Sequence, residues 1–229
     1  MSNQIVLYGN AYNDVANIVS KYEKTIIVTD PPYNIKYHYN TYTDNKKNED
    51  YWRDLKNLFS LCPSVVIMYP ESLYVLAAHM NKIPDKVCSW VYNANTEKQH
   101  RDAAYFGIKP DFNLYKQPYK NMDDKRVKEL YKRTGGARSY DWKELPQVKN
   151  KNKDDGGIGV VHPCQMPVDI MKWLVGITPK EYVVIDPFSG SGTTGVACAL
   201  LDREFIGIEI DEDYVKLGNA RIDNAKSEE

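Results

Sequence analysis

The amino-acid sequence predicts an α/β fold in which helices cover both faces of a doubly wound, mostly parallel sheet. Two β-branched runs, residues 25–29 and 183–185, read as buried strands of that sheet. The second run passes through a Gly-rich turn into an apolar helix, which is the order expected of a βαβ unit. A chain of 229 residues with 42% hydrophobic content can bury the core of one such domain, so we expect a single domain over residues 1–229.

The first half of the chain is expected to alternate strands with helices. Apolar runs bounded by polar residues, Gly or Pro predict the strands, and apolar residues at helical spacing predict the helices. In chain order, we expect a strand at 4–8, a helix at 12–22, a strand at 25–29, a helix at 49–61, a strand at 65–68, a helix at 71–81 and a strand at 87–92.

The second half completes the sheet. A helix is expected to open at Pro167, which suits a first helical turn, and to run to residue 177. Its apolar face toward the sheet consists of Ile170, Met171, Leu174 and Val175. A further helix follows the Gly-rich turn at 196–201, residues 205–210 form a strand, and Asp211 caps a terminal helix that reaches about residue 226.

The tetrapeptide Asp30-Pro31-Pro32-Tyr33 directly follows the strand at 25–29. In an open α/β sheet, ligands bind in the crevice beyond the carboxyl ends of the strands, and two prolines make the backbone there rigid. Asp, Pro and Tyr are also common in ordinary turns that end strands. The tetrapeptide alone therefore favours a turn, and a second motif is needed to indicate a functional site.

The second motif is the Gly-rich turn, in which Gly190, Gly192 and Gly195 match the G-x-G-x-x-G pattern. The next apolar run carries Glu209, which lies 19 residues after Gly190. In nucleotide-binding folds, a carboxylate about 20 residues after the first glycine binds the ribose hydroxyls. The spacing predicts a site for a cofactor that contains a nucleoside, although Glu209 could also be a surface acid at a strand end.

Two kinds of cofactor site fit less well. A P-loop needs Lys followed by Ser or Thr, whereas Val196 and Ala197 follow Gly195. A nicotinamide dinucleotide fold usually starts with this unit and adds several strands after it, but only 19 residues follow Ile210. The other strands must precede the Gly-rich turn, which predicts a Rossmann-like sheet in a circularly permuted motif order.

These motifs, in this order, resemble those of the DNA amino-methyltransferases that use S-adenosylmethionine, in the permuted arrangement called the β class. The resemblance covers roughly residues 4–60 and 160–222. It is supported by Asp30-Pro31-Pro32-Tyr33, by the segment 186–194, by Tyr8-Gly9-Asn10, by the segment 162–167 and by the segment 205–209 with Asp211 and Tyr214. Asn10 stands where the family usually has an acid that meets the adenine of the cofactor, and Met166 stands where it has a lysine.

The resemblance implies that the residues of the tetrapeptide are catalytic: Asp30, Pro31, Pro32 and Tyr33. The amine of a nucleobase is a poor nucleophile because its lone pair is delocalised into the ring. Acceptors at the Asp30 carboxylate and the Pro31 carbonyl would take its two N–H groups and draw the lone pair toward the methyl donor. The base must leave the duplex to reach them, and the Tyr33 ring offers a surface for stacking.

The resemblance also implies a cofactor site for S-adenosylmethionine. Its expected residues lie at four places in the chain: Asn10; Asp30; Pro163 and Gln165; and the group Asp186, Phe188, Ser189, Gly190, Ser191, Gly192, Thr193, Glu209 and Ile210. Some of them could instead be structural, since Asn10 could simply terminate a strand and Asp186 could orient the Gly-rich turn. No metal is needed for this chemistry.

The expected reaction is site-specific methylation of adenine N6 in DNA, of the kind found in restriction-modification systems. The target rests on Asp30, because family members that act on cytosine N4 more often have Ser at this position. Methylation of cytosine N4 is the nearest alternative. An RNA or protein-amide methyltransferase, a nicotinamide-dependent oxidoreductase and a DNA-binding module without catalysis also stay open.

Charge is distributed unevenly along a chain whose formal net charge is only −1. Between Lys116 and Lys153 there are 12 Lys and Arg against 5 Asp and Glu, with Tyr and Trp interleaved. We expect a target-recognition insertion at residues 95–158 that binds double-stranded DNA through Lys125, Arg126, Lys132, Arg133 and Arg138. Charge alone favours a solvated surface insertion.

The cysteine spacing and the length of the apolar stretches indicate where in the cell the protein is expected. The four cysteines lack the close spacing of zinc or redox motifs, and no apolar stretch is long enough for a signal peptide or a membrane span. We expect a cytoplasmic protein, a monomer or a homodimer, that does not bind membranes. The segment 34–50, rich in Tyr, Asn and Lys, is expected to be a mobile loop beside the site.

Overall fold

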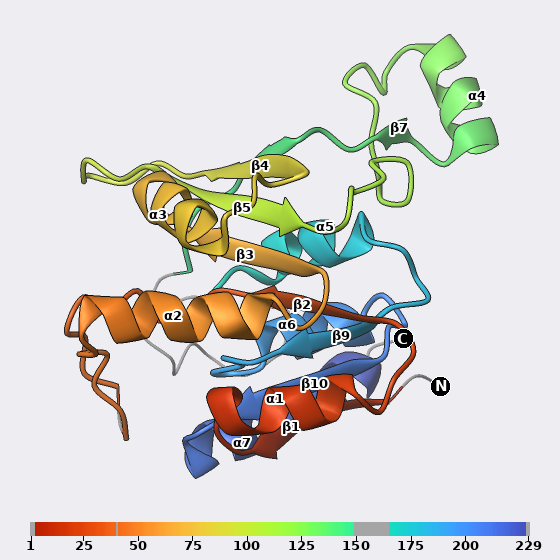
Figure 1. The fold of residues 1–229 in the computed structure, drawn as a ribbon. Helices are drawn as coiled ribbons and strands as arrows, with labels where there is room; N and C mark the ends of the chain where they lie inside the picture. Colours follow the sequence, from red (N-terminus) through yellow and green to blue (C-terminus); the bar gives the residue numbers. More distant parts are fainter. Residues whose placement is uncertain (1–2, 40, 149–164, 228–229) are drawn as a thin grey trace.

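An eight-stranded sheet forms the centre of the structure, a computed structural model that describes residues 3–39, 41–148 and 165–227 (Figure 1). Across the sheet the order is β1 (Gln4–Tyr8), β10 (Phe205–Glu209), β9 (Val183–Asp186), β2 (Thr25–Thr29), β3 (Ser64–Met68), β5 (His100–Phe106), β4 (Lys86–Val91) and β8 (Trp142–Glu144). The first five strands in this order are parallel to one another, β5 is antiparallel to β3 and β4, and β4 is parallel to β8.

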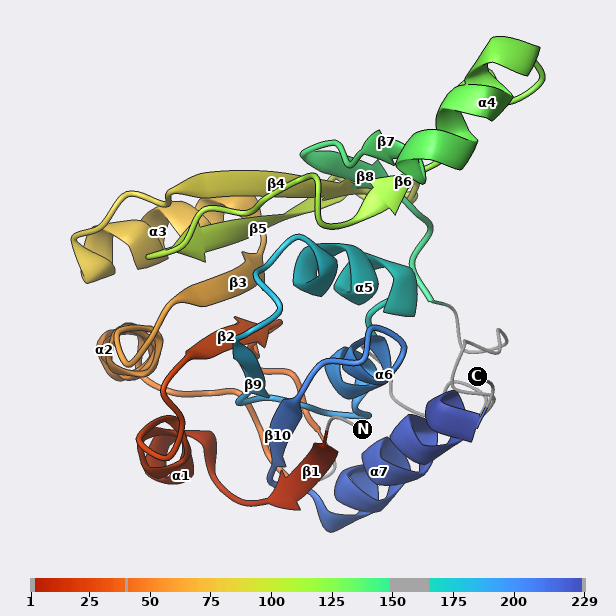
Figure 2. The same cartoon turned by 90° about the vertical axis from the view of Figure 1, so that its right-hand side faces the viewer.

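Helices cover both faces of this sheet (Figure 2). One face carries α1 (Ala11–Val19), α2 (Asn48–Phe59) and α3 (Pro70–Met80), and the other carries α5 (Val168–Gly176), α6 (Thr193–Ala199) and α7 (Glu212–Ser227). Successive side chains of β2 enter opposite cores, with Ile27 on the first face and Ile26 and Val28 on the second. The predicted doubly wound, mostly parallel and permuted fold is confirmed.

Most elements lie within a few residues of their predicted bounds. The strands predicted at 4–8 and 25–29 have those bounds, and the four apolar residues predicted to face the sheet from α5 are all buried. Asp211 caps α7 as predicted, because its carboxylate accepts hydrogen bonds from the N–H groups of Asp213 and Tyr214. The loop predicted at 34–50 is shorter, since α2 begins at Asn48.

The strand β5, which lies between β3 and β4, was not predicted from the sequence. This strand begins with three polar residues, His100, Arg101 and Asp102, and only its second half is buried, so its pattern is not that of a central strand. Its pairing with β3 and β4 decides its conformation. The expected insertion at 95–158 therefore contains two strands of the main sheet, β5 and β8.

The part of the insertion that projects from the sheet lies between these two strands and consists of β6 (Lys116–Gln117), α4 (Lys125–Thr134) and β7 (Ala137–Arg138) (Figures 1 and 2). The helix α4 buries none of its residues. Its ends are capped by the Asp124 carboxylate, which accepts from the N–H of Arg126, and by Gly135, which has a φ of 71°. Residues 149–158 of the expected insertion lie outside the described residues.

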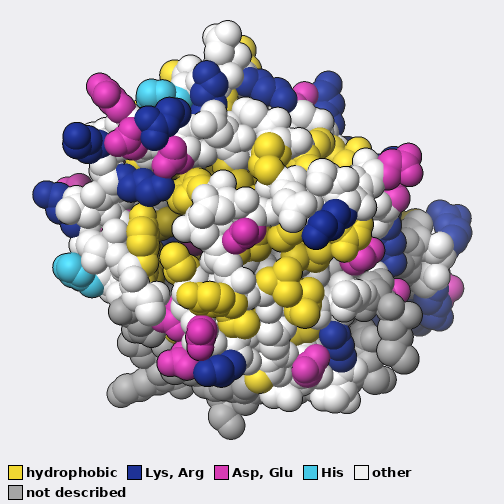
Figure 3. Space-filling view, turned by 60° about the horizontal axis from the view of Figure 1, so that its bottom comes forward, with side chains coloured by type: hydrophobic (Ala, Val, Ile, Leu, Met, Phe, Trp, Pro, Cys, Tyr) yellow, Lys and Arg dark blue, Asp and Glu magenta, His cyan; other side chains and the backbone are white. Residues whose placement is uncertain are grey.

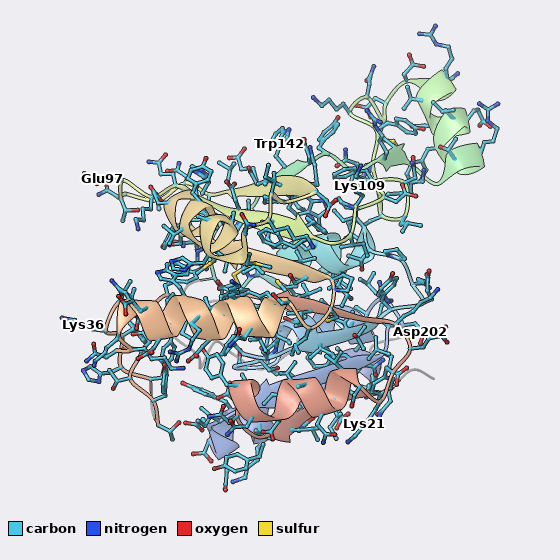
Figure 4. All side chains as sticks on the ribbon, in the orientation of Figure 1. Lys21, Lys36, Glu97, Lys109, Trp142 and Asp202 are labelled. Atoms are coloured by element: carbon cyan, nitrogen blue, oxygen red, sulfur yellow. The ribbon has the colours of Figure 1, made fainter. Side chains whose placement is uncertain are left out.

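The projecting segment leaves the sheet at the edge opposite the crevice that was predicted to bind ligands. It follows Phe106, which pairs with Ser64 at the amino end of β3, whereas Asp30 follows the carboxyl end of β2. In Figure 4, Lys36 and Glu97 lie at one edge of the molecule, and Lys109, at the start of the projecting segment, lies toward the other. A contact between α4 and the crevice is therefore excluded by the length of the strands between them.

Candidate active site

A cavity of about 360 Å³ opens beyond the carboxyl ends of β1, β2, β9 and β10. This volume lies within the range of sites that hold small molecules. Nine of the residues predicted for the site line it: Asn10, Asp30, Pro31, Pro32, Tyr33, Phe188, Gly190, Glu209 and Ile210. The tetrapeptide and the Gly-rich turn, distant in the sequence, therefore meet at one cavity because β2 and β9 are neighbours in the sheet.

The tetrapeptide is held in place from α2 and from within. The hydroxyl of Tyr51 donates a 2.8 Å hydrogen bond to the carbonyl of Pro32, and Pro31 is buried. The hydroxyl of Tyr33 donates to Oδ1 of Asp30. The prolines and these two hydroxyls fix the direction in which the Asp30 carboxylate points, before any ligand binds.

Arg101 completes the surroundings of Asp30 and was missed by the sequence analysis. Its Nη1 lies 3.0 Å from Oδ2 of Asp30, and both side chains are largely buried. It reaches the cavity from β5, the strand that the sequence pattern did not predict. The one signal in the sequence is an arginine just ahead of the apolar run 103–106, and that signal is weak.

Burial and the neighbouring polar groups shift the pKa of Asp30 in opposite directions. Burial raises the pKa of its carboxyl group above the ordinary value, while the charge of Arg101 and the hydrogen bond from Tyr33 lower it. Arg101 and Tyr33 thus favour the carboxylate, which accepts hydrogen bonds, in a place where burial favours the neutral acid.

Asp186 lies beneath the Gly-rich turn and does not line the cavity. Oδ1 accepts hydrogen bonds from the hydroxyl of Thr29 at 2.6 Å and from the N–H of Phe188 at 3.1 Å, and Oδ2 accepts from the hydroxyl of Thr194. Asp186 therefore ties the ends of β2 and β9 to the start of α6. Its position fits the interpretation that it orients the turn.

The Gly-rich turn is also braced from α7. Arg221 is buried and its Nη1 donates to the carbonyl of Ser191 at 2.6 Å, and also lies within 3.3 Å of the Thr193 hydroxyl. Gly192 has a φ of 78°, and a Cβ there would lie 2.7 Å from the backbone of Gly218. This close approach, which only glycine permits, brings α7 against the turn.

Five further residues predicted to bind the cofactor lie in or behind this turn and away from the cavity wall. The Ser191 hydroxyl donates to Oε1 of Gln165 at 3.4 Å. The other four are Ser189, Ser191, Gly192 and Thr193. Pro163 lies outside the described residues. The role of these residues toward a cofactor stays a prediction.

Glu209 ends β10 with its carboxylate on the cavity wall. Oε2 accepts from the N–H of Gly190 at 2.8 Å, and Oε1 accepts from the N–H groups of Ile210 and Asp211 at 2.9 Å. Burial raises the pKa of Glu209, and these N–H groups lower it. A carboxylate has about four lone-pair positions, so it can still accept from a ligand hydroxyl.

Asn10 and Phe188 form the neighbouring wall. The side chain of Asn10 accepts from the N–H of Tyr12 at 3.0 Å and so caps α1. The Tyr12 ring packs edge-on against Phe188, with 5.8 Å between the ring centroids, and Nζ of Lys46 lies 3.7 Å from the centroid of Tyr12. Asn10 therefore has a structural role as a helix cap as well as a place on the cavity wall.

The Tyr-rich loop after the tetrapeptide forms the outer wall. Asp44 is buried within it and accepts hydrogen bonds from the N–H groups of Ile35 and Tyr37. Tyr37 and Tyr39 pack edge-on at 4.8 Å, and both line the cavity with Tyr42. The loop lies beside the site as predicted, and its mobility stays a prediction.

Replacement of Asp186 by Asn is expected to remove a pH dependence of stability. Burial raises the pKa of Asp186 to about 6, so the folded protein holds this proton more tightly than the unfolded chain. The stability linked to that proton is fully present below the unfolded pKa and is lost as the pH rises through about 6. The amide can keep the hydrogen bonds, because its oxygen accepts from Thr29 and Phe188 and its NH₂ group donates to Thr194.

Urea unfolding at low and neutral pH measures this effect. Between about pH 5 and pH 8 the native protein should lose about 1 kcal/mol of stability more than the Asp186→Asn variant. If the two proteins lose the same amount, Asp186 does not hold a proton in this range.

A family model described as a DNA methylase, N6_N4_Mtase, matches residues 25–220. The chain belongs to this family of DNA methylases. The match spans the tetrapeptide, the Gly-rich turn and Glu209, so it includes both halves of the cavity. The predicted membership of the DNA amino-methyltransferases is thereby confirmed.

Named relatives agree with the family. This chain is similar to the Type II methyltransferase M.HpaI of Haemophilus parainfluenzae, with 28% identity over 87% of this chain and 68% of that protein. It is also similar to the DNA adenine methyltransferase YhdJ of Escherichia coli (strain K12), with 27% identity over 96% of this chain and 83% of that protein.

Solved structures share the fold. The complex of M1.HpyAVI with SAM superposes with a TM-score of 0.63 at 19% identity and covers 95% of this chain and 98% of that one. The PvuII DNA methyltransferase, described as cytosine-N4-specific, gives a TM-score of 0.62 at 12% identity, over 96% of this chain and 87% of that one. At these identities the likeness concerns the fold.

Metal centres and membrane-spanning helices are both absent from the described part of the chain. Among residues 3–39, 41–148 and 165–227, no group of three or more His, Cys, Asp or Glu side chains is placed to hold a metal ion. Over the same residues, no helix combines the length and the apolar character needed to cross a membrane.

Proposed function

We propose that this methylase transfers a methyl group from S-adenosylmethionine to N6 of adenine in DNA, at a base flipped out of the duplex. The observation that carries the proposal is that Asp30 and Glu209 line one cavity, joined by Phe188 and the Gly-rich turn. A cofactor that binds at Glu209 and a base that binds at Asp30 would therefore lie within reach of each other.

The residues at the Glu209 end of the cavity suit this cofactor. The carboxylate of Glu209 can accept a hydrogen bond from a ribose hydroxyl, and Phe188, Ile208 and Ile210 offer apolar surface to the adenine ring of the cofactor. Gly190, whose φ is 51°, brings the turn close to the cavity without a side chain in the way. When bound, S-adenosylmethionine would supply an electrophilic methyl group, whose bond to sulfur would break as the bond to nitrogen forms, and the proton released by the amine would pass to the Asp30 carboxylate or to water.

The residues at the Asp30 end bind and orient the amine. The carboxylate of Asp30 accepts one N–H of the exocyclic amine and the Pro31 carbonyl accepts the other, which makes the nitrogen tetrahedral and turns its lone pair toward the cofactor end. The Pro32 carbonyl already accepts from Tyr51, so this hydrogen bond fixes the turn. The Tyr33 and Tyr69 rings, which pack edge-on at 5.3 Å, line the cavity and exclude water from the amine.

Nucleoside analysis of DNA incubated with the protein and labelled S-adenosylmethionine tests this proposal. Label is expected in N6-methyladenine, because family members that act on cytosine N4 more often have Ser at the position of Asp30, and because YhdJ, a similar protein, is named as an adenine methyltransferase. Recovery of N4-methylcytosine alone would mean that the target base is cytosine, while the reaction would still be methylation of a base amine. The PvuII enzyme shows that this fold is compatible with that target. Label confined to RNA or protein would contradict DNA as the substrate.

The basic projecting segment supports a second part of the proposal, namely contact with double-stranded DNA. Figure 3 shows a face on which cations and anions are mixed, whereas α4 carries five Lys and Arg against one Glu. The residues proposed to bind DNA, Lys125, Arg126, Lys132, Arg133 and Arg138, are all exposed. Since α4 leaves the sheet at the edge opposite the cavity, these residues would contact the duplex away from the flipped base.

Neutralisation of Lys125, Arg126, Lys132 and Arg133 together is expected to weaken DNA binding about tenfold at physiological salt and to flatten its salt dependence, because each phosphate contact releases about 0.9 counterion. Salt titrations of DNA affinity measure both effects, and the affinity for S-adenosylmethionine should be unchanged. Replacement of the lysines of β4 and α7, Lys86, Lys216 and Lys226, serves as the charge control. A quadruple variant with the native affinity and salt slope would mean that the segment is only a solvated surface.

A single catalytic domain that works as a monomer or homodimer, in the cytoplasm and away from membranes, stays a prediction. Gel filtration with light scattering would determine the oligomeric state.

A further inference from the structure

Arg101 has more hydrogen-bonding capacity than its contacts use. Its Nη1 donates to Oδ2 of Asp30 at 3.0 Å and lies 3.4 Å from Sδ of Met166. Its Nε is buried against the protein, with no hydrogen-bond partner among the residues that the structure describes, so a ligand in the cavity can be contacted only by the terminal nitrogens of the guanidinium. A guanidinium carries five N–H donors in a rigid plane, and a buried donor without an acceptor is unfavourable. The pair with Asp30 alone does not explain why an arginine stands here.

Aromatic rings fix the plane of this guanidinium. Its Cζ lies 5.4 Å from the ring centroids of Tyr33 and Tyr69 and 5.5 Å from that of Trp90. Such contacts are favourable for a cation and restrict its rotation. Arg101 also lines the cavity together with Asp30 and Tyr33. A fixed donor therefore stands next to a fixed acceptor at the place where the target amine is proposed to bind.

We propose that Arg101 reads the target base by donating a hydrogen bond to the ring nitrogen next to the amine, while Asp30 accepts from the amine itself. The proposal rests on the proposed function. In adenine the amine at C6 adjoins the acceptor N1, and in cytosine the amine at C4 adjoins the acceptor N3. Guanine and thymine present the reverse, a carbonyl oxygen beside a ring N–H. The ordered pair of Asp30 and Arg101 thus matches the amine and ring nitrogen of adenine and cytosine, and it repels the carbonyl and ring N–H of guanine and thymine.

This proposal makes Arg101 a specificity residue that touches the substrate. The alternative is that Arg101 acts only through Asp30, by keeping that carboxyl group ionised and in place. The two roles differ in one respect that can be measured. Only a residue that touches the ring nitrogen responds to removal of that nitrogen from the DNA.

The test compares adenine with 1-deazaadenine, which keeps the N6 amine and lacks N1. The methylated position is first located in DNA that the native protein has labelled, and a duplex oligonucleotide with that sequence carries either base at the target. Single-turnover methyl transfer by the native protein should be about 10–100-fold slower on 1-deazaadenine, the effect of one lost hydrogen bond to a charged group. In the Arg101→Met variant, which is slow on adenine, the same base change should cost less than about threefold.

The outcomes separate the two roles. Equal slowing by 1-deazaadenine in the native protein and in Arg101→Met would overturn the proposal and leave Arg101 as a positioning residue for Asp30. If Arg101→Met does not fold, the native protein decides alone, because equal rates on the two bases also overturn the proposal. Arg101→Lys keeps the charge without the planar donors and should lie between the native protein and Arg101→Met in its response.

Two controls test whether the response to 1-deazaadenine is specific to Arg101 and to the methylated base. Arg53→Met removes an arginine from the exposed surface of α2, where its side chain is 60% exposed, and should respond to 1-deazaadenine as the native protein does. If the labelled base proves to be cytosine, 3-deazacytosine replaces 1-deazaadenine with the same expectation. Absence of any labelled base in DNA would refute the proposed function, and that result is distinct from a native protein that methylates both bases equally.

Discussion

The Asp30→Ala variant is expected to lose methyl transfer by at least about 10³-fold and to bind S-adenosylmethionine with nearly native affinity. Asp30 offers the charged acceptor for the amine, and removal of a preorganised group of this kind costs about 10²–10³ in rate, with the loss of the Arg101 partner added. The proposed cofactor contacts lie at the other end of the cavity, so they remain. Single-turnover transfer and calorimetry measure the two effects separately.

The control for Asp30 is an exposed carboxylate. Asp213→Ala removes a side chain that is 86% exposed on α7, and we expect native transfer. Because Arg101 is buried beside Asp30, the Asp30→Ala variant leaves a buried charge unpaired, and its stability must be measured by urea unfolding. A folded Asp30→Ala variant with more than about a tenth of the native rate would refute the catalytic role of Asp30.

The Glu209→Ala variant is expected to bind S-adenosylmethionine about 1–3 kcal/mol more weakly, the order of a lost hydrogen bond to a charged group. The structure adds a second reason for a loss, because Glu209 also holds the N–H groups of Gly190 and Asp211 in place. Glu209→Gln keeps one oxygen acceptor for them and should lose less. Calorimetry with S-adenosylmethionine measures all three proteins.

Glu212→Ala, an exposed substitution in the first turn of α7, is the matched control and should bind as the native protein does. If Glu209→Ala is folded and binds S-adenosylmethionine with unchanged affinity, Glu209 does not contact the ribose. The turn around Gly190 would then be the place to search for the residues that determine cofactor affinity.

The parts of the site that consist of continuous chain could be predicted from the sequence. The tetrapeptide at 30–33 and the Gly-rich turn at 190–195 each combine a buried β-branched strand with rigid or permissive residues directly after it. Such signals are local, because Pro and Gly act through their own backbone geometry. The order of the two motifs predicts the permuted sheet, and in the structure β2 and β9, the strands that precede them, are parallel neighbours.

Residues that support the site from a distance could not be identified in this way. Arg221 braces the Gly-rich turn from α7, and Tyr51 holds the Pro32 carbonyl from α2, yet each looks like an ordinary helical residue in the sequence. Asp186 was expected either to touch the cofactor or to orient the Gly-rich turn, and its hydrogen bonds with Thr29 and Thr194 fit the second interpretation. A role of this kind depends on which strands are neighbours.

Local sequence patterns were enough to predict the α/β class, the permuted order and the two motifs, and the resemblance to the DNA amino-methyltransferases implied the chemistry of the tetrapeptide. Only the tertiary structure decided that β5 lies in the sheet, that Arg101 on this strand pairs with Asp30, and that the basic helix α4 stands at the edge away from the cavity. The physical reason is the range of the forces involved. Backbone restriction by Pro and Gly and the period of apolar residues act within a few residues, whereas the conformation of β5 and the burial of Arg101 come from pairing and packing with segments far along the chain.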